Sequence, residues 1–232
     1  MNTSRIEKTR KLTMLAMLCA LAYVVMLIGR IPLISVGSLV LKYDPKDVII
    51  AIGGFIFGPL SALLISVVVS LVEMLTVSET GFIGFAMNVV ATAAFVCPAA
   101  FFYKKKHTMG GAVLGLSIGL VLMTLMMILW NYFLTPLYLG YPREAVVELL
   151  LPLFLPFNLI KGGINMALTL LIYKPSVKAL RHIKLLTPDA AAAPTPTKGK
   201  RTALIIGAVI LLVLCVFVAL VLNDKIMLPF LS

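Results

Sequence analysis

The stretch that most constrains the fold is a membrane-length apolar run at residues 151–173, LPLFLPFNLIKGGINMALTLLIY, which carries three polar side chains. Asn158, Lys161 and Asn165 follow one another at spacings of three and four, so a helix places them on one face. A lysine in the hydrocarbon region costs about 2.5–3.5 kcal/mol on insertion scales. A polar face of this kind therefore predicts a partner, a cavity or a ligand.

The composition of the whole chain is that of an integral membrane protein. Of its 232 residues, 61% are hydrophobic and only 12% are charged, which is far outside the range of soluble domains. The net charge of +11 could indicate nucleic-acid binding, but the lysines and arginines lie in short clusters beside the apolar runs. The positive-inside rule explains such clusters, so we expect a lipid bilayer and no nucleic acid as the partner.

The apolar runs predict an all-α integral membrane protein with a six-helix bundle and an additional C-terminal transmembrane helix. We expect the bundle within residues 1–184, a flexible linker at 185–201, and the extra helix with a short extracellular tail at 202–232. The bundle helices are predicted at about 12–28, 45–57, 60–75, 81–102, 109–134 and from 156 onward. Basic clusters at the ends of these helices place the N-terminus in the cytoplasm and the C-terminus outside.

Two segments between the predicted helices are expected to lie outside. Residues 30–43, RIPLISVGSLVLKY, are too broken for a span and too apolar for a solvated loop. They predict a semi-buried extracellular lid over a pocket, or equally a re-entrant or interfacial segment. Asp44 is predicted to cap the next helix, with Pro45 at its first position and Asp47 in its first turn. Residues 135–150 are expected to form an outer loop.

On this topology the polar side chains within the spans share the outer half of the membrane. Asn88, Asn131, Glu73 and Lys161 converge under the predicted lid. They predict a concave site, reached from outside, for an uncharged or mildly anionic molecule with many hydrogen-bonding groups. Phe157 could stack on a planar ligand. The alternative for Lys161 is that it snorkels to the interface or pairs with Glu73.

Several signatures of catalysis are missing from the sequence. It has no Gly-rich phosphate loop of the G-x-x-x-x-G-K-[ST] kind, no metal-binding histidine cluster and no evident pair of nucleophile and base. We therefore expect no enzyme activity, no catalytic cofactor and no metal.

Five short motifs carry a family resemblance: KYDPKD at 42–47, GGFIFGPL at 53–60, TGFIGFAMN at 80–88, WNYF at 130–133 and LPFNLIKG at 155–162. With these motifs the chain resembles the substrate-binding S components of energy-coupling factor (ECF) vitamin transporters, specifically the riboflavin-specific ones. The resemblance covers roughly residues 10–180 and agrees with the missing phosphate loop, because in this family the ATPases are separate subunits.

The resemblance implies that riboflavin binds near the outer face, beneath the loop that follows the first helix. Asn131, Asn158 and Lys161 match the positions that make the polar contacts. It also implies that Ala16 and Ala20, an Ala-x-x-x-Ala pair, dock a transmembrane coupling subunit that works with two cytosolic ATPases. From spacing alone these alanines fit ordinary helix packing equally well. The S component is expected to topple in the membrane and so carry its site inward.

The candidate site also includes side chains of the lid and its flanks. The complete set of candidate substrate-binding residues is Asn131, Asn158, Lys161, Asn88, Leu41, Tyr43, Asp44 and Phe157. Three alternatives remain at this point: an S component for FMN, one for another vitamin such as thiamine, and a flavin-carrying membrane protein that does not transport. Family members usually end after the sixth helix, so the seventh span is interpreted as a loosely tethered anchor or a docking element.

Overall fold

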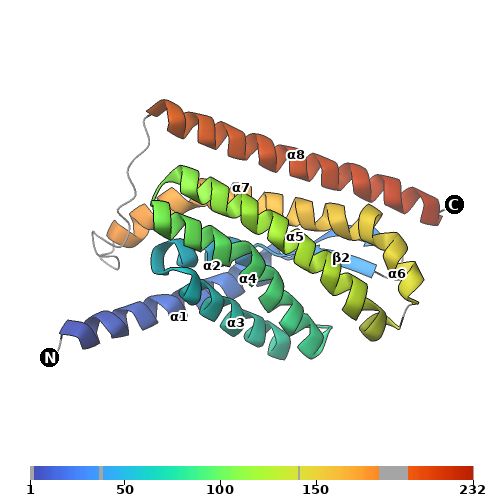
Figure 1. Ribbon diagram of the computed structural model, residues 1–232, viewed down its shortest axis with the longest axis horizontal. Coiled ribbons are helices and arrows are strands. Elements are labelled where there is room, and N and C mark those ends of the chain that lie inside the picture. The colour runs from blue at the N-terminus through green and yellow to red at the C-terminus, as the bar shows by residue number, and fades with distance from the viewer. Residues whose placement is uncertain (1–2, 37–38, 141, 183–197, 232) are drawn as a thin grey trace.

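The computed structural model describes residues 3–36, 39–140, 142–182 and 198–231, and nearly all of them are helical (Figure 1). The elements in chain order are α1 (Thr3–Gly29), β1 (Ile31–Val36), β2 (Leu39–Tyr43), α2 (Lys46–Phe57), α3 (Pro59–Thr76), α4 (Gly81–Lys106), α5 (Met109–Leu139), α6 (Arg143–Leu149), η1 (Leu150–Phe154), α7 (Leu155–His182) and α8 (Lys198–Leu231). The predicted six bundle helices correspond to α1 to α5 and α7, and α8 is the additional C-terminal helix. The predicted fold class is therefore confirmed.

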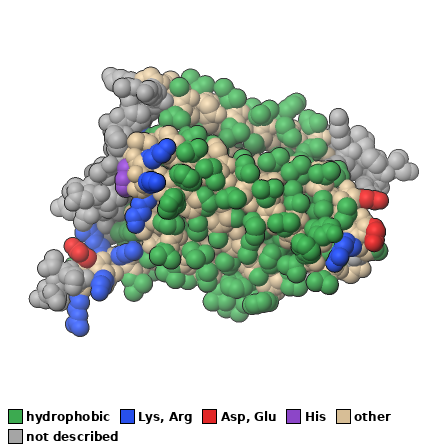
Figure 2. Space-filling view, viewed as in Figure 1, with side chains coloured by type: hydrophobic (Ala, Val, Ile, Leu, Met, Phe, Trp, Pro, Cys, Tyr) green, Lys and Arg blue, Asp and Glu red, His purple; other side chains and the backbone are tan. Residues whose placement is uncertain are grey.

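Long apolar helices give the molecule a surface suited to lipid. Within the described residues, six helical stretches are long and apolar enough to cross a membrane, and the short α2 is not among them. Figure 2 shows hydrophobic side chains over the middle of one face, with Lys and Arg side chains gathered mainly toward one end. Large exposed side chains such as Leu60, Val121 and Leu125 belong to this apolar surface.

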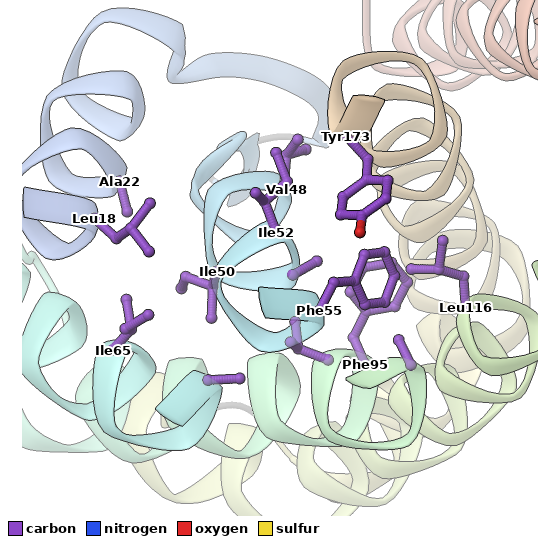
Figure 3. Close-up of a cluster of buried hydrophobic side chains, with 14 of the residues drawn as sticks. Leu18, Ala22, Val48, Ile50, Ile52, Phe55, Ile65, Phe95, Leu116 and Tyr173 are labelled. Carbon is purple, nitrogen blue, oxygen red and sulfur yellow. The ribbon is translucent and has the colours of Figure 1, made fainter. Parts of the chain in front are cut away.

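Helix α2 lies at the centre of the bundle, where it contacts α1, α3, α4 and α7 (Figure 3). Its 12 residues span only about 18 Å at a rise of 1.5 Å per residue. It is apolar on all sides beyond its first turn, and this pattern is typical of a helix buried all round. Val48, Ile52 and Phe55 pack in the main core. Its C-terminal turn at Gly58 lies beside Lys104 of α4, so α2 runs from the interior to the lysine-rich end.

Helices α4 and α5 approach each other closely because glycines repeat every four residues on α5. A Cβ atom at Gly115 would lie 2.8 Å from the Ala99 Cα, and one at Gly119 would lie 2.1 Å from the Phe95 carbonyl oxygen. Small residues at this spacing let two membrane helices pack backbone against backbone. This packing fixes α5, which carries Asn131, relative to α4, which carries Asn88.

Residues 31–36 and 39–43 pair as the two antiparallel strands of a hairpin, where the sequence predicts no strand. Strand β1 pairs with β2 from Ile31 opposite Tyr43 to Val36 opposite Leu39, with an irregularity between Pro32 and Ile34. The segment is rich in β-branched and apolar residues, and proline is tolerated on an edge strand or at a bulge. The hairpin covers the segment for which the sequence predicts either a lid or a re-entrant or interfacial segment, and it is more regular than either expectation.

The segment after α5 is also more ordered than predicted. Helix α5 continues through Pro136 to Leu139, and residues 143–154 form α6 and the π-helical turn η1 rather than a loop. Helix α8 continues to Leu231, so the predicted tail at 223–232 is largely helical. The predicted linker at 185–201 lies mostly outside the described residues.

Candidate functional site

A cavity of about 410 Å³ lies beneath the hairpin, between α3, α4, α5 and α7. This volume falls within the range of about 300–1,000 Å³ that is usual for small-molecule sites. Apolar walls come from Leu41 of β2, Met123 and Met127 of α5, Phe154 of η1 and Phe157 of α7. Amide and charged side chains line the rest, so the cavity offers flat apolar surfaces together with hydrogen-bonding groups.

Seven of the eight predicted substrate-binding residues line this one cavity: Leu41, Asp44, Asn88, Asn131, Phe157, Asn158 and Lys161. Tyr43 is the exception, because its side chain packs with Ile160 and Ile164 of α7. Its hydroxyl donates a hydrogen bond to the Asn165 Oδ1, at 2.9 Å. The Tyr43 side chain therefore packs behind the cavity wall and does not face the cavity. Asn165, which the sequence places on the polar face of the helix, also lies behind the cavity, where it hydrogen-bonds to Tyr43.

Two of the buried asparagines, Asn131 and Asn158, line the cavity and are held by carbonyl oxygens of the preceding turn. Asn131 donates through Nδ2 to the Met127 carbonyl oxygen, at 2.7 Å, and its Oδ1 accepts from Thr135. Asn158 donates through Nδ2 to the Phe154 carbonyl oxygen, also at 2.7 Å. An amide nitrogen carries two hydrogens, so each side chain keeps one N–H for a ligand.

The π-helical turn η1 positions Phe154 at the cavity and leads into α7, which carries Phe157. Proline at 152 and 156 prevents regular α-helical hydrogen bonding around this turn. Turns of this type are frequent at functional sites because they change the direction in which side chains project. Here the turn places Phe154 and Phe157 together against the underside of the hairpin, where both pack with Ile34.

A buried cluster of charged side chains forms the polar end of the cavity. Glu73 of α3 is paired with both Arg30 and Lys46, and it also accepts a hydrogen bond from the Asn88 Nδ2, at 3.1 Å. The Asp44 carboxylate lies 3.6 Å from the Lys161 Nζ and 3.8 Å from the Lys46 Nζ. Lys161 is thus paired, but with Asp44 and not with Glu73, the partner considered from the sequence.

Asp47 completes the cluster from the first turn of α2. Its two carboxylate oxygens accept hydrogen bonds from the Thr92 hydroxyl, at 2.6 Å, and from the Asn165 Nδ2, at 3.2 Å. With Arg30, Lys46 and Lys161 against Asp44, Asp47 and Glu73, the cluster has three positive and three negative formal charges. Buried charges are tolerated when they are paired and hydrogen-bonded in this way.

The prediction that Asp44 caps α2 is wrong. The residue before α2 is Pro45, without a side-chain cap, and the Asp44 carboxylate faces the lysines instead. Burial raises the pKa of Asp44, but the nearby charges of Lys161, Lys46 and Arg30 outweigh that effect and hold the pKa below its usual value. One oxygen, Oδ1, is buried without a hydrogen-bond donor among the described residues and lies 3.8 Å from the Lys46 Nζ.

Sequence reasoning missed Lys46 and Arg30 as members of the site. Lys46 is fully buried. The available signal was the run Asp44-Pro45-Lys46-Asp47 directly before an apolar helix, because so many charges cannot enter a bundle without partners. The ion-pair partners of Lys46 and Arg30 come from other helices, so residue spacing along a single helix does not predict them.

The family model for "ECF transporter, substrate-specific component" matches residues 10–173. The chain belongs to this family. The matched region of the S component includes the hairpin, the cavity and the whole buried cluster, whereas α8 lies beyond it. The S component is therefore a transport protein subunit of multi-pass membrane type.

Individual relatives agree with this family. The S component is 32% identical over 176 residues to the "Riboflavin transporter RibU" of Streptococcus thermophilus, covering 72% of this chain and 82% of the relative. It is 30% identical over 186 residues to the "Riboflavin transporter FmnP" of Bacillus subtilis, covering 75% and 97%. A solved structure described as "Structure and mechanism of the S component of a bacterial ECF transporter" matches with a TM-score of 0.63 and 28% identity, over 75% of this chain and 99% of that one.

The predicted partner-docking pair lies away from the cavity. Ala16 and Ala20 are both exposed on α1, while Ala22 of the same helix is fully buried. In Figure 1, α1 and α8 lie on opposite sides of the bundle. The alanine stripe is therefore accessible for another helix, and α8 does not cover it.

Proposed function

We propose that this S component binds riboflavin at the cavity beneath the hairpin and takes it up across a bacterial cytoplasmic membrane. The observation that carries the proposal is the combination of flat apolar walls with an array of amide and charged groups in one cavity. Phe154, Phe157 and the methionines of α5 suit an aromatic ring system. The names of the relatives, both riboflavin transporters, support the same ligand.

The polar groups suit the two kinds of hydrogen-bonding surface on riboflavin. Its ring system ends in a dione edge with carbonyl oxygens and one N–H, and its side chain carries hydroxyl groups. The free N–H groups of Asn131 and Asn158 and the Lys161 ammonium can donate to the carbonyl oxygens. The Asp44 carboxylate, which lines the cavity, can accept from an N–H or a hydroxyl group. These roles assign Asn131, Asn158, Lys161 and Asp44 to the ligand.

The charges of the cavity favour uncharged riboflavin over FMN and thiamine. Each cation in the lining has an acidic partner: Arg30 with Glu73, Lys161 with Asp44, and Lys42 with Glu79, the last at 2.7 Å. A phosphate group would need a cation released from its partner, because a buried anion without one is costly. The cationic ring of thiamine would need a carboxylate in the same way. Among the described residues, the lining offers neither an unpaired cation for a phosphate group nor an unpaired carboxylate for thiamine.

Transport requires partners that supply energy. As a member of its family, the S component works within an ECF transporter, and we propose a transmembrane coupling subunit and two cytosolic ATPases as its partners. We assign the docking surface for the coupling subunit to the exposed Ala16 and Ala20 on α1, where small residues allow close helix contact. In this arrangement the N-terminus is cytoplasmic and the cavity opens to the outside before toppling.

Fluorescence titration of the purified full chain tests the proposed ligand. Riboflavin fluorescence should be quenched on binding, and FMN and thiamine should bind at least about tenfold more weakly, a difference of about 1.4 kcal/mol. Asn158→Ala should weaken riboflavin binding about 5- to 150-fold, because a ligand acceptor loses its donor at a cost of about 1–3 kcal/mol. Thr124→Val is the matched control, since its buried hydroxyl bonds only to the Leu120 carbonyl oxygen and lies outside the cavity. A colourless preparation that fails to quench riboflavin would refute the proposal.

A second measurement separates transport from fixed flavin carriage. Cells that contain the S component with its partner subunits should accumulate labelled riboflavin, and bound vitamin should exchange with external vitamin. A protein that keeps its flavin for electron transfer would retain the label without exchange, and that result would favour the non-transporting alternative.

A further inference from the structure

Helix α8 lies outside the region shared with the family, yet it packs against the substrate-binding bundle. It contacts α7 and β1 and runs beside α7 in the opposite chain direction (Figure 1). Its buried side chains are Ala208, Cys215 and Ala219, which share one face of the helix. Side chains on the other face, including Ile210 and Phe217, are exposed as expected for lipid contact. These contacts do not fit a loosely tethered anchor.

Helix α8 contacts α7 closely at Gly163. A Cβ atom at Gly163 would lie 2.6 Å from the Cys215 Sγ, so only glycine fits here without a shift. The adjacent Gly162 faces Leu120 and Met123 of α5 in the same way. Paired glycines directly after Lys161 thus let α7 pack tightly on α5 and α8. Helix α8 is fitted to the helix that carries Asn158 and Lys161.

The outer part of α8 reaches the hairpin. Cys215 and Ala219 pack with Tyr43 of β2 in one apolar cluster. Leu222 packs against that cluster and also against the cluster of Ile34 and Phe157, which lies between the hairpin and the cavity wall. A two-stranded hairpin is at best marginally stable alone, so its position depends on the elements it packs against. Helix α8 is one of them.

We propose that α8 is a strap that holds the hairpin closed over the cavity and thereby sets the rate at which ligand is exchanged. This inference rests on the proposed function, because it takes the cavity as the riboflavin site. To open the site, the hairpin must part from Leu222 and Ala219 or move together with α8. The strap therefore slows ligand release and ligand entry together, and it acts on the lid without contacting the ligand.

A disulfide between α7 and α8 tests the strap in the full chain. In Gly163→Cys the new Cβ lies close enough to the Cys215 Sγ for a bond with an S–S length of about 2.0 Å after a small adjustment. Oxidation should slow riboflavin dissociation at least about tenfold, and reduction of the same sample should restore the faster rate. Gly163→Cys with Cys215→Ser is the control and should respond to neither treatment. Equal dissociation rates for the oxidised and reduced variant, with the crosslink verified by mass spectrometry, would overturn the proposal.

A second pair of variants loosens the strap instead of locking it. Leu222→Ala should speed riboflavin dissociation several-fold and association in proportion, so that the rates change more than the affinity. Leu220→Ala removes the same atoms from an exposed position on α8 and should leave both rates unchanged. An unchanged dissociation rate in Leu222→Ala would count against the strap. If the unmodified chain fails to bind riboflavin, the proposed function fails; if it binds and only these rates are insensitive, the strap alone fails.

Discussion

The buried lysine of α2 offers the sharpest test of the charged cluster. Lys46 is fully buried and is paired with Glu73 and Asp44. Lys46→Met keeps a side chain of similar length but removes the charge, so the cluster changes from three cations and three anions to an excess of one anion. Breaking a buried ion pair by removing one partner costs about 3–5 kcal/mol.

The lower end of this range applies at Lys46. Glu73 keeps Arg30 as a partner, and Asp44 keeps Lys161, so neither carboxylate is left alone. We therefore expect Lys46→Met to lower the free energy of unfolding by about 3 kcal/mol. This loss corresponds to a change of about 150-fold in the unfolding equilibrium. Denaturant unfolding of the purified protein in detergent, without riboflavin, measures it.

Two further variants make the result decisive. Lys42→Met removes a lysine whose ion pair with Glu79 is exposed, and such pairs contribute little, so its stability should match the parent protein. Lys46→Met with Glu73→Gln restores the charge balance, and the amide oxygen that replaces the carboxylate can still accept from Asn88, so stability should partly recover. The reasoning is refuted if Lys46→Met is no less stable than Lys42→Met, or if the double variant is less stable than Lys46→Met alone.

Three more outcomes are expected. Tyr43→Phe removes the hydrogen bond to Asn165 and should lower the unfolding free energy by about 0.5–1.5 kcal/mol, while riboflavin titration should show nearly unchanged affinity because Tyr43 lies outside the cavity. Gly119→Ala places a methyl group against the α4 backbone and should destabilise by at least about 1–3 kcal/mol in the same unfolding assay, whereas Gly110→Ala, with its nearest neighbour at 3.9 Å, should be tolerated. The pKa of Asp44 is lowered in the folded protein, so its contribution to stability is present above the unfolded value of about 3.9 and is lost as the pH falls through the folded pKa. Riboflavin affinity measured from about pH 5 to 8 should therefore show no titration of this group; a transition in that interval that Asp44→Asn abolishes would contradict the assignment.

The sequence predicted the features that depend on residue type and local spacing. Asn131, Asn158 and Lys161 were identified because polar side chains are costly in an apolar span, and the structure brings them to one cavity. The hairpin was not predicted as strands, since a short apolar segment with Pro32 fits several conformations. The partner of Lys161 depends on how α2 and α7 meet, and helical periodicity within α7 carries no such information.

The balance of the buried cluster has an electrical consequence. Moving one elementary charge across the membrane potential involves about 2.3 kcal/mol per 100 mV. Arg30, Lys46 and Lys161 are matched in number by Asp44, Asp47 and Glu73. With all six groups ionised, a bundle that carries this cluster inward with an uncharged vitamin moves no net charge with its site. In the proposed cycle the membrane voltage then neither drives nor opposes the reorientation of the loaded site, and the direction of uptake is set by ATP hydrolysis in the partner subunits.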